Sequence, residues 1–83
     1  MTFTGTLQYK SYEDESGNII SIIPDPEEEE MLLVVRLSQE GDVEHISAFT
    51  VEDEDKAIAF LDQYCENNNY KESKPRLGYA FNW

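Results

Sequence analysis

The run MLLVVRL at residues 31–37 most constrains this chain, because it is apolar on both faces of an extended strand. Successive side chains of a strand point to opposite sides of a sheet. One face would carry Met31, Leu33, Val35 and Leu37, and the other Leu32, Val34 and Arg36. Strands that are apolar on both faces are typically central and covered on both sides. The sequence therefore predicts a sheet with material packed on each face of this strand.

Two β-hairpins are predicted from the flanking segments. Residues 3–12 alternate, with Phe3, Leu7 and Tyr9 on one face, which is typical of a half-buried strand. The turn sequence EDESGN then leads into IISIIP, a strand rich in β-branched residues. After residues 31–38, QEGD turns the chain into VEHISAFTV, the fourth predicted strand.

Residues 53–67, DEDKAIAFLDQYCEN, change to a helical period and predict an amphipathic helix. Its apolar stripe consists of Ala57, Ile58, Phe60, Leu61, Tyr64 and Cys65. Thr50 or Asp53 is expected to cap the start, and residues 67–69, all asparagine, to supply a left-handed stop. Strand periodicity returns over residues 77–83. We therefore predict one α+β domain over residues 1–83, ordered ββββαβ: an antiparallel or mixed sheet of four to five strands with one helix on a face.

Charge is unevenly distributed along the 83 residues, whose net charge is −12. Residues 1–55 hold 15 acidic and 2 basic side chains, whereas residues 56–83 hold 3 acidic and 4 basic ones. Such a surface repels nucleic acid and anionic membranes and attracts basic partners. Direct binding to nucleic acid or to a membrane is therefore not expected.

Cysteine usage and the N-terminal residues bear on location. The single cysteine, Cys65, permits no intramolecular disulfide, which favours an intracellular setting. The start MTFTGTLQYK has no basic segment followed by an apolar block, and no stretch is long enough to span a membrane. We expect a cytoplasmic protein.

Cys65 and His45 are the candidate catalytic pair, since a thiolate beside an imidazole is a strong nucleophile. Cys65 lies on the helical stripe expected to face the core, where a free cysteine behaves as a small apolar residue. His45, the only histidine, lies on a predicted strand and is more simply a surface residue. We expect a non-enzymatic protein with no catalytic residues.

No metal or cofactor is expected either. If Gly17 is placed at position 6 of a calcium loop, Tyr12 and Ile23 fall at positions 1 and 12, where the motif requires acids. One Cys and one His are too few for zinc. Phosphate-binding glycine motifs are absent. The basic cluster Lys71, Lys74 and Arg76, near Tyr70 and Tyr79, is too small to favour single-stranded nucleic acid.

Mimicry of nucleic acid is the sharper hypothesis for the acidic residues. Side chains at i and i+2 of an extended chain lie about 6.6 Å apart on one side, and a DNA strand carries one charge per roughly 3.4 Å. Alternate members of EEEE could therefore imitate neighbouring phosphates. The candidate partner-binding acids are Glu13, Asp14, Glu15, Asp25, Glu27, Glu28, Glu29, Glu30, Glu52, Asp53, Glu54 and Asp55. The alternative for each cluster is local: a hairpin tip, a solvated connection and a helix start.

The C-terminal aromatic residues offer a second class of function. Tyr79, Phe81 and Trp83 fall on one strand face, which is either core or an apolar interface. As an interface, they would make the chain a structural or accessory subunit that binds a partner or forms a homodimer.

No motif is specific enough to name a family. In composition alone the chain resembles the small acidic proteins by which phages block host nucleases, restriction enzymes or CRISPR complexes. That resemblance implies an inhibitor or DNA mimic that masks a basic surface of a nuclease or another nucleic-acid-binding protein, and this is our leading hypothesis.

Overall fold

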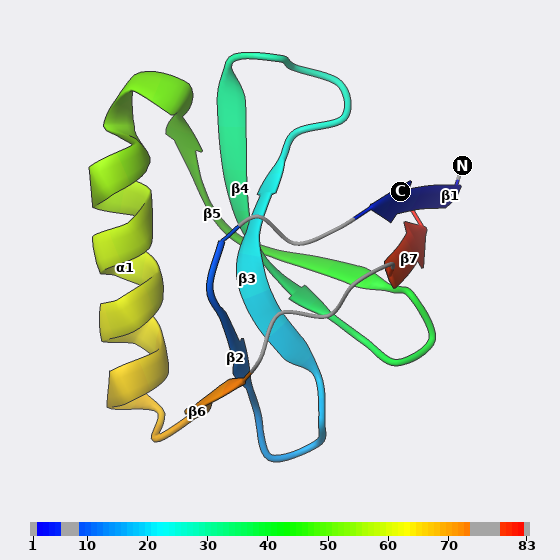
Figure 1. Cartoon of the computed structure of the whole chain (residues 1–83), viewed down its shortest axis with the longest axis vertical. Coiled ribbons are helices and arrows are strands. Elements are labelled where there is room, and N and C mark those ends of the chain that lie inside the picture. Colours follow the sequence, from blue (N-terminus) through cyan, green and yellow to red (C-terminus); the bar gives the residue numbers. More distant parts are fainter. Residues whose placement is uncertain (1, 6–8, 74–78, 83) are drawn as a thin grey trace.

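The computed structural model describes the backbone of residues 2–5, 9–73 and 79–82 and the side chains of residues 9–73. In chain order the elements are β1 (Thr2–Gly5), β2 (Ser11–Glu13), β3 (Ile19–Pro24), β4 (Met31–Leu37), β5 (Val43–Thr50), the 3₁₀ turn η1 (Val51–Asp53), α1 (Glu54–Asn67), β6 (Lys71–Ser73) and β7 (Tyr79–Asn82). Five strands form one sheet in the order β5-β4-β3-β2-β6, and all its pairings are antiparallel. Helix α1 packs on one face (Figure 1). The predicted α+β class is confirmed.

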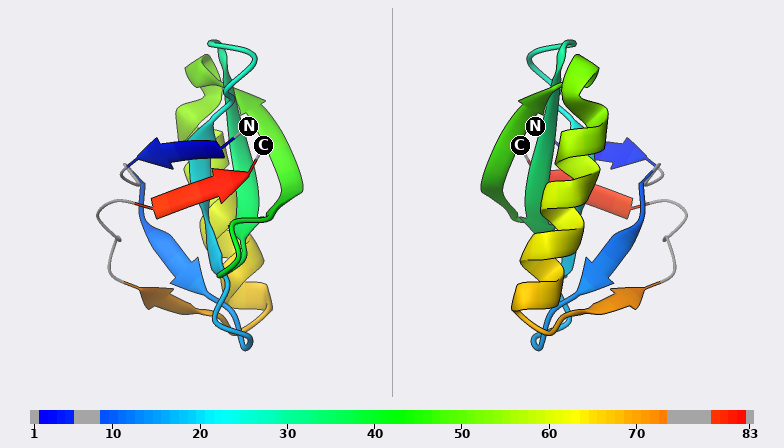
Figure 2. Two further views of the ribbon diagram at one scale, coloured as in Figure 1. Left: turned by 90° about the vertical axis from the view of Figure 1, so that its right-hand side faces the viewer. Right: turned by 90° about the vertical axis from the view of Figure 1, so that its left-hand side faces the viewer.

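Both faces of β4 are buried, as the sequence predicts, and β4 is an interior strand between β3 and β5. The core on the helix side contains Tyr12, Ile20, Ile22, Leu32, Val34, Ala57, Leu61 and Cys65. The core on the other side contains Ile19, Ile23, Leu33, Val35 and Leu37. The two-stranded ladder of β1 and β7 lies on this second side, across the sheet from α1 (Figure 2). The five-stranded sheet is therefore the middle layer.

Two turns of the same construction connect β2 to β3 and β4 to β5. In each, a glycine with positive φ lies three residues after a side-chain acceptor: Gly17 (φ 83°) after Asp14, and Gly41 (φ 90°) after Ser38. Each acceptor takes the backbone N–H groups of the residues two and four positions later. A Cβ at Gly17 would lie 2.7 Å from Nε2 of Gln39, so the two turns are close together. Both predicted hairpins are confirmed.

The first predicted strand, residues 3–12, is wrong as a single element. Its beginning forms β1 and pairs with β7, whereas its end forms β2 and pairs with β3 and β6. The segment therefore belongs to two separate sheets, a division that depends on distant partners rather than on its own alternation. The short edge strand β6 was not predicted. Residues 79–82 do form a strand, as their alternation suggests.

Helix α1 begins after a 3₁₀ turn and not at a capping side chain. Asp53 occupies the N-cap position, but neither it nor Thr50 makes a side-chain capping hydrogen bond, so the predicted cap is wrong. The Thr50 hydroxyl instead lies 3.3 Å from the Asp53 carboxylate. At the other end, Asn69 has φ 59° and the Tyr70 N–H donates to the Cys65 carbonyl oxygen. The predicted left-handed stop is confirmed.

Candidate functional site

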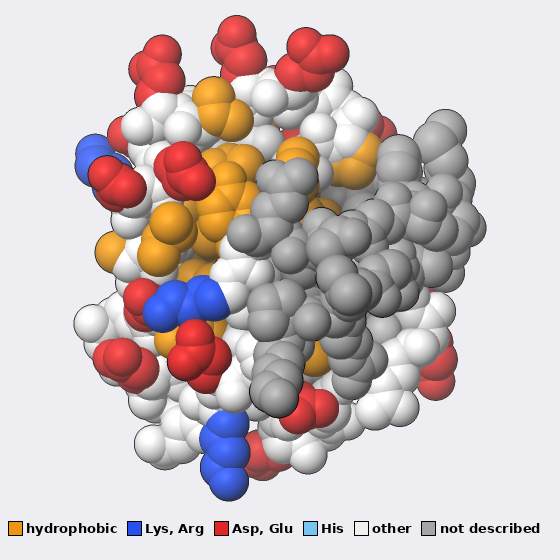
Figure 3. Space-filling model, viewed as in Figure 1, with side chains coloured by type: hydrophobic (Ala, Val, Ile, Leu, Met, Phe, Trp, Pro, Cys, Tyr) orange, Lys and Arg blue, Asp and Glu red, His pale blue; other side chains and the backbone are white. Residues whose placement is uncertain are grey.

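Two of the three predicted acidic clusters lie together at one end of the sheet. The backbone N–H of Val51 donates to the Glu30 carbonyl oxygen at 2.8 Å, which joins the β3–β4 connection to the start of the helix. Residues 27–30 therefore lie beside residues 52–55, and we call these eight carboxylates the acidic end. All eight side chains are exposed except Asp53, which is half-buried. Acidic side chains project at the upper end of the molecule in Figure 3, where α1 begins.

Asp25 has a structural role at the edge of this region. Its Oδ1 accepts a hydrogen bond from the backbone N–H of Glu27 at 2.8 Å, and its own N–H donates to the Met31 carbonyl oxygen at 2.9 Å. These bonds shape the connection that presents the four consecutive glutamates. Asp25 therefore positions the acidic end and is itself half-buried.

The third cluster, residues 13–15, lies at the opposite end of the sheet. Glu13 pairs with Ile19 at the start of β3, whereas the acidic end follows Pro24, where β3 finishes. A six-residue strand spans roughly 17–20 Å. The three clusters consequently do not form one continuous surface.

Asp14 is engaged within the protein. Its Oδ2 accepts a hydrogen bond from the Asn18 side-chain amide at 3.1 Å and lies 3.1 Å from Nε of Arg36. That Arg36 nitrogen is buried and its approach to Asp14 is an ion pair without hydrogen-bond geometry. Burial alone would raise the pKa of Asp14, but hydrogen bonds from Asn18 and Ser16, together with the Arg36 charge, lower it overall.

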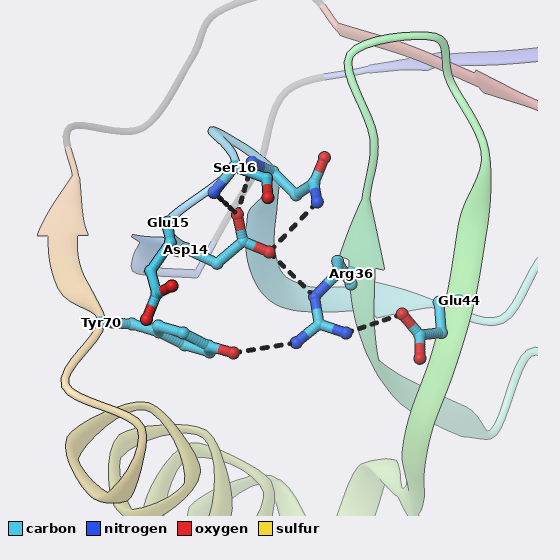
Figure 4. Close-up of a pocket in the computed structure, with 7 residues that line it drawn as sticks. Asp14, Glu15, Ser16, Arg36, Glu44 and Tyr70 are labelled. Atoms are coloured by element: carbon cyan, nitrogen blue, oxygen red, sulfur yellow. Dashed lines mark hydrogen bonds and ion pairs between the residues drawn. The ribbon is translucent and has the colours of Figure 1, made fainter.

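Arg36 is the centre of this network, which sequence reasoning missed (Figure 4). Its two terminal nitrogens donate to Glu44 at 2.7 Å and to the hydroxyl oxygens of Tyr64 and Tyr70 at 3.2 Å each. The hydrogen bond to Glu44 is the largest of the effects that raise the pKa of Arg36. The guanidinium thus connects β4, β5, the β2–β3 turn and the end of α1. The signal in the sequence that could have indicated this network is the position of Arg36, a charged residue on the same face of β4 as Leu32 and Val34.

A shallow hollow of about 400 Å³ opens beside Arg36. Its lining consists of Asp14, Glu15, Ser16, Asn18, Arg36, Glu44 and Tyr70. Three of its charged groups pair with one another, since Arg36 contacts both Asp14 and Glu44, whereas Glu15 is exposed. The arrangement is therefore a structural ion-pair network, with no nucleophile and base in contact among these residues.

Of the four basic side chains that the structure describes, Lys10, Arg36 and Lys56 form ion pairs. Lys10 lies 3.0 Å from Asp62, which also accepts a hydrogen bond from the Tyr12 hydroxyl at 2.8 Å. Lys56 lies 3.8 Å from Asp53. Of the basic cluster singled out in the sequence, Lys71 is exposed on β6. Lys74 and Arg76 lie outside the described residues.

Cys65 and His45 lie on opposite faces of the sheet. His45 pairs with Val35, which belongs to the core on the side away from the helix, and directly paired residues point to the same face. Cys65 is fully buried between α1 and the other face. Burial raises the pKa of Cys65 to about 11, so at neutral pH the group is a thiol and a poor nucleophile. This geometry provides no cysteine–histidine pair.

Native protein is expected to react slowly with a thiol reagent at neutral pH, because Cys65 is both inaccessible and protonated. The measurement is the rate of labelling by a chromogenic disulfide, with protein in denaturant as the control that reacts fast. Rapid labelling of the folded chain, stoichiometric with Cys65, would show that this interpretation of the helix face is wrong.

The C-terminal aromatic residues are only partly placed. Tyr79 and Phe81 belong to β7, whose backbone pairs with β1, in the register Gly5 to Tyr79 and Phe3 to Phe81. Their side chains, and the whole of Trp83, lie outside the described residues. Whether they form core or interface stays a prediction.

Comparisons with known proteins give no assignment. No family model matches the chain, and no curated protein or solved structure gave a significant match. Within the described part of the chain, no three His, Cys, Asp or Glu side chains converge as they would around a metal ion. The same residues include no helix with the length and apolarity needed to cross a membrane.

Proposed function

We propose that the chain is a non-enzymatic binding protein whose acidic end masks a basic surface of a nucleic-acid-binding protein. In this role it acts as an inhibitor that imitates nucleic acid, in the manner of phage proteins that counter host defences. The observation that carries the proposal is the joining of residues 27–30 to residues 52–55 through the Val51–Glu30 hydrogen bond.

The charges at this end support the proposal. Eight carboxylates lie on two adjoining segments, and Lys56 is the basic residue paired among them, through an exposed contact with Asp53 of 3.8 Å. Exposed pairs of this kind contribute little and are screened by salt. The field of the acidic end therefore remains strongly negative, which speeds association with a basic surface.

The first test replaces Glu27, Glu28, Glu29 and Glu30 with glutamine. Partners captured from a lysate on the immobilised wild-type chain at low salt are identified, and one that binds nucleic acid is purified. We expect its affinity for the quadruple variant to fall by at least about tenfold, because four carboxylates at the contact are neutralised. We also expect the wild-type chain to displace labelled duplex DNA from it.

The matched control neutralises four exposed acids elsewhere, Glu15, Glu40, Glu66 and Glu72. Both variants carry the same net charge. If the acidic end is the contact surface, the variant at residues 27–30 should lose more affinity than the control variant. Equal losses would assign the effect to net charge alone. Affinity that does not change with salt, or DNA that is not displaced, would overturn the proposal.

A further inference from the structure

Within the described part of the chain, β5 forms one long open edge of the five-stranded sheet. It has eight residues, more than any other described strand, and it is outermost in the sheet order. No described element lies beyond it in either view of Figure 2. Edge strands are usually protected by shortness, by charged residues (especially lysine), by proline or by a β-bulge. Strand β5 carries Glu44 and a bulge, but residues 47–50, which follow the bulge, contain no charged residue and no proline.

The backbone groups that face this open edge follow from the pairing with β4. Because Val51 donates to Glu30, residues 30 and 51 are a hydrogen-bonded pair, and hydrogen-bonded and non-hydrogen-bonded pairs alternate along an antiparallel ladder. Ala48 and Thr50 therefore fall in non-hydrogen-bonded pairs. Their N–H and C=O groups point away from β4, toward the open edge.

A bulge limits the regular part of this edge to the end of β5. The register with β4 shifts between Val34 and Val35, so residues 47–50 form the uninterrupted stretch after the shift. A bulge leaves its extra residue unpaired and bends the strand, so a regular ladder is not continued across it on the open edge. An added strand would thus pair with residues 47–50, which lead directly into the acidic end.

Apolar side chains line the same stretch. Phe49 is half-buried, and its ring lies 5.7 Å from that of Phe60 on α1, which in turn stacks 6.0 Å from Tyr64. Val51, the next residue after β5, is 43% exposed and is the most exposed large hydrophobic residue among the described side chains. An apolar side chain on an added strand would therefore find contacts beside Val51 and Phe49.

The charge next to this edge favours one kind of binding partner over another. A second copy would bring another net charge of −12 against the acidic end, which opposes association. A basic segment would instead be attracted to the acidic end. We propose that an extended, basic segment of the partner adds to β5 as a further strand, pairing with Ala48 and Thr50 and placing lysine or arginine on the acidic end. This inference rests on the proposed function and names the form of its partner.

The test uses Thr50→Pro in the full chain. Thr50 has φ −77°, which proline adopts without strain, and its N–H faces the open edge, so the substitution blocks pairing there while leaving the β4–β5 ladder intact. Thr50→Ala is the matched control, since it removes the same hydroxyl contact with Asp53 but keeps the N–H. Circular dichroism checks that both variants are folded.

The probe is a short labelled peptide of alternating lysine and valine, compared with the same peptide N-methylated at every residue. Methylation keeps the charge and side chains but removes every backbone donor. Binding measured by fluorescence anisotropy should weaken at least about tenfold with methylation or with Thr50→Pro, and change little with Thr50→Ala.

Each other outcome has a separate meaning. Equal binding of both peptides, or of the wild-type and Thr50→Pro chains, overturns strand addition; if that binding is still lost with the four glutamines at 27–30, the proposed electrostatic function survives. Methylation-sensitive binding that ignores salt and those glutamines supports the edge and contradicts the proposed function. Dimerisation of the wild-type chain that Thr50→Pro abolishes would show a second copy as the occupant and overturn the proposal.

Discussion

Replacing Arg36 with methionine is expected to lower the free energy of unfolding by about 2–4 kcal/mol. The substitution leaves the Asp14 carboxylate, whose side chain is 9% exposed, without its cation, and deprives the hydroxyl groups of Tyr64 and Tyr70 of their donor. Removing one partner of a buried ion pair typically costs about 3–5 kcal/mol. We expect somewhat less here, because the Arg36 side chain is 20% exposed and water screens the pair with Glu44.

Two variants separate the parts of this network. Glu44→Gln should cost at most about 1 kcal/mol, because the Glu44 side chain is 62% exposed. Arg36→Lys keeps a charge near Asp14 but lacks the planar fork that reaches several partners at once, so it should fall between the other two. Urea unfolding followed by circular dichroism gives the three values. An Arg36→Met chain as stable as the wild type would contradict a structural role for the network.

Local chemistry explains the parts of the fold that the sequence predicted. Asp14 and Gly17, and likewise Ser38 and Gly41, bring an acceptor and a left-handed residue together within one turn, so each hairpin needs no distant contact. Residues 31–37 are apolar on both faces, which likewise required a covered interior strand. These features depend on the residues themselves and their nearest neighbours.

Long-range pairing explains the parts that the sequence did not predict. The split of residues 3–12 depends on β7, which lies at the other end of the chain, and β6 exists because β2 offers an edge to a three-residue segment. The Arg36 network joins residues from 14 to 70, far beyond any local pattern. Such contacts follow from the topology of the sheet, which cannot be predicted from the local patterns of a single sequence.

The acidic site shows the same division. The sequence identified residues 27–30 and 52–55 as candidates, but their joining depends on the β4–β5 pairing and the Val51–Glu30 bond. Residues 13–15 looked equivalent in sequence and lie at the far end of the sheet. Within that third cluster, Asp14 is also paired with Arg36. Acidic residues that look the same in the sequence therefore differ in exposure and in ion pairing.

Leu61→Ala is expected to have the largest effect on stability, with a loss of about 3–4 kcal/mol. Leu61 is fully buried between α1 and the sheet, and a buried leucine cut to alanine loses transfer free energy and leaves a cavity. Alanine has the higher helix propensity, so the loss would come from packing. A domain of this size has a total stability of about 4–12 kcal/mol. If the stability of the wild-type chain lies near the lower end of this range, much of the Leu61→Ala chain would be unfolded.

Leu61→Met is the control for this prediction, since it nearly conserves volume and should cost less than about 1.5 kcal/mol. Urea midpoints compared at a constant m-value give both losses. The Cys65 thiol provides an independent reading, because it is buried in the same core and should be labelled faster in Leu61→Ala than in the wild-type chain. If Leu61→Ala unfolds at the wild-type midpoint, α1 does not hold the sheet through this core. The connection between the helix start and residues 27–30 would then rest on the β4–β5 pairing and the Val51–Glu30 bond.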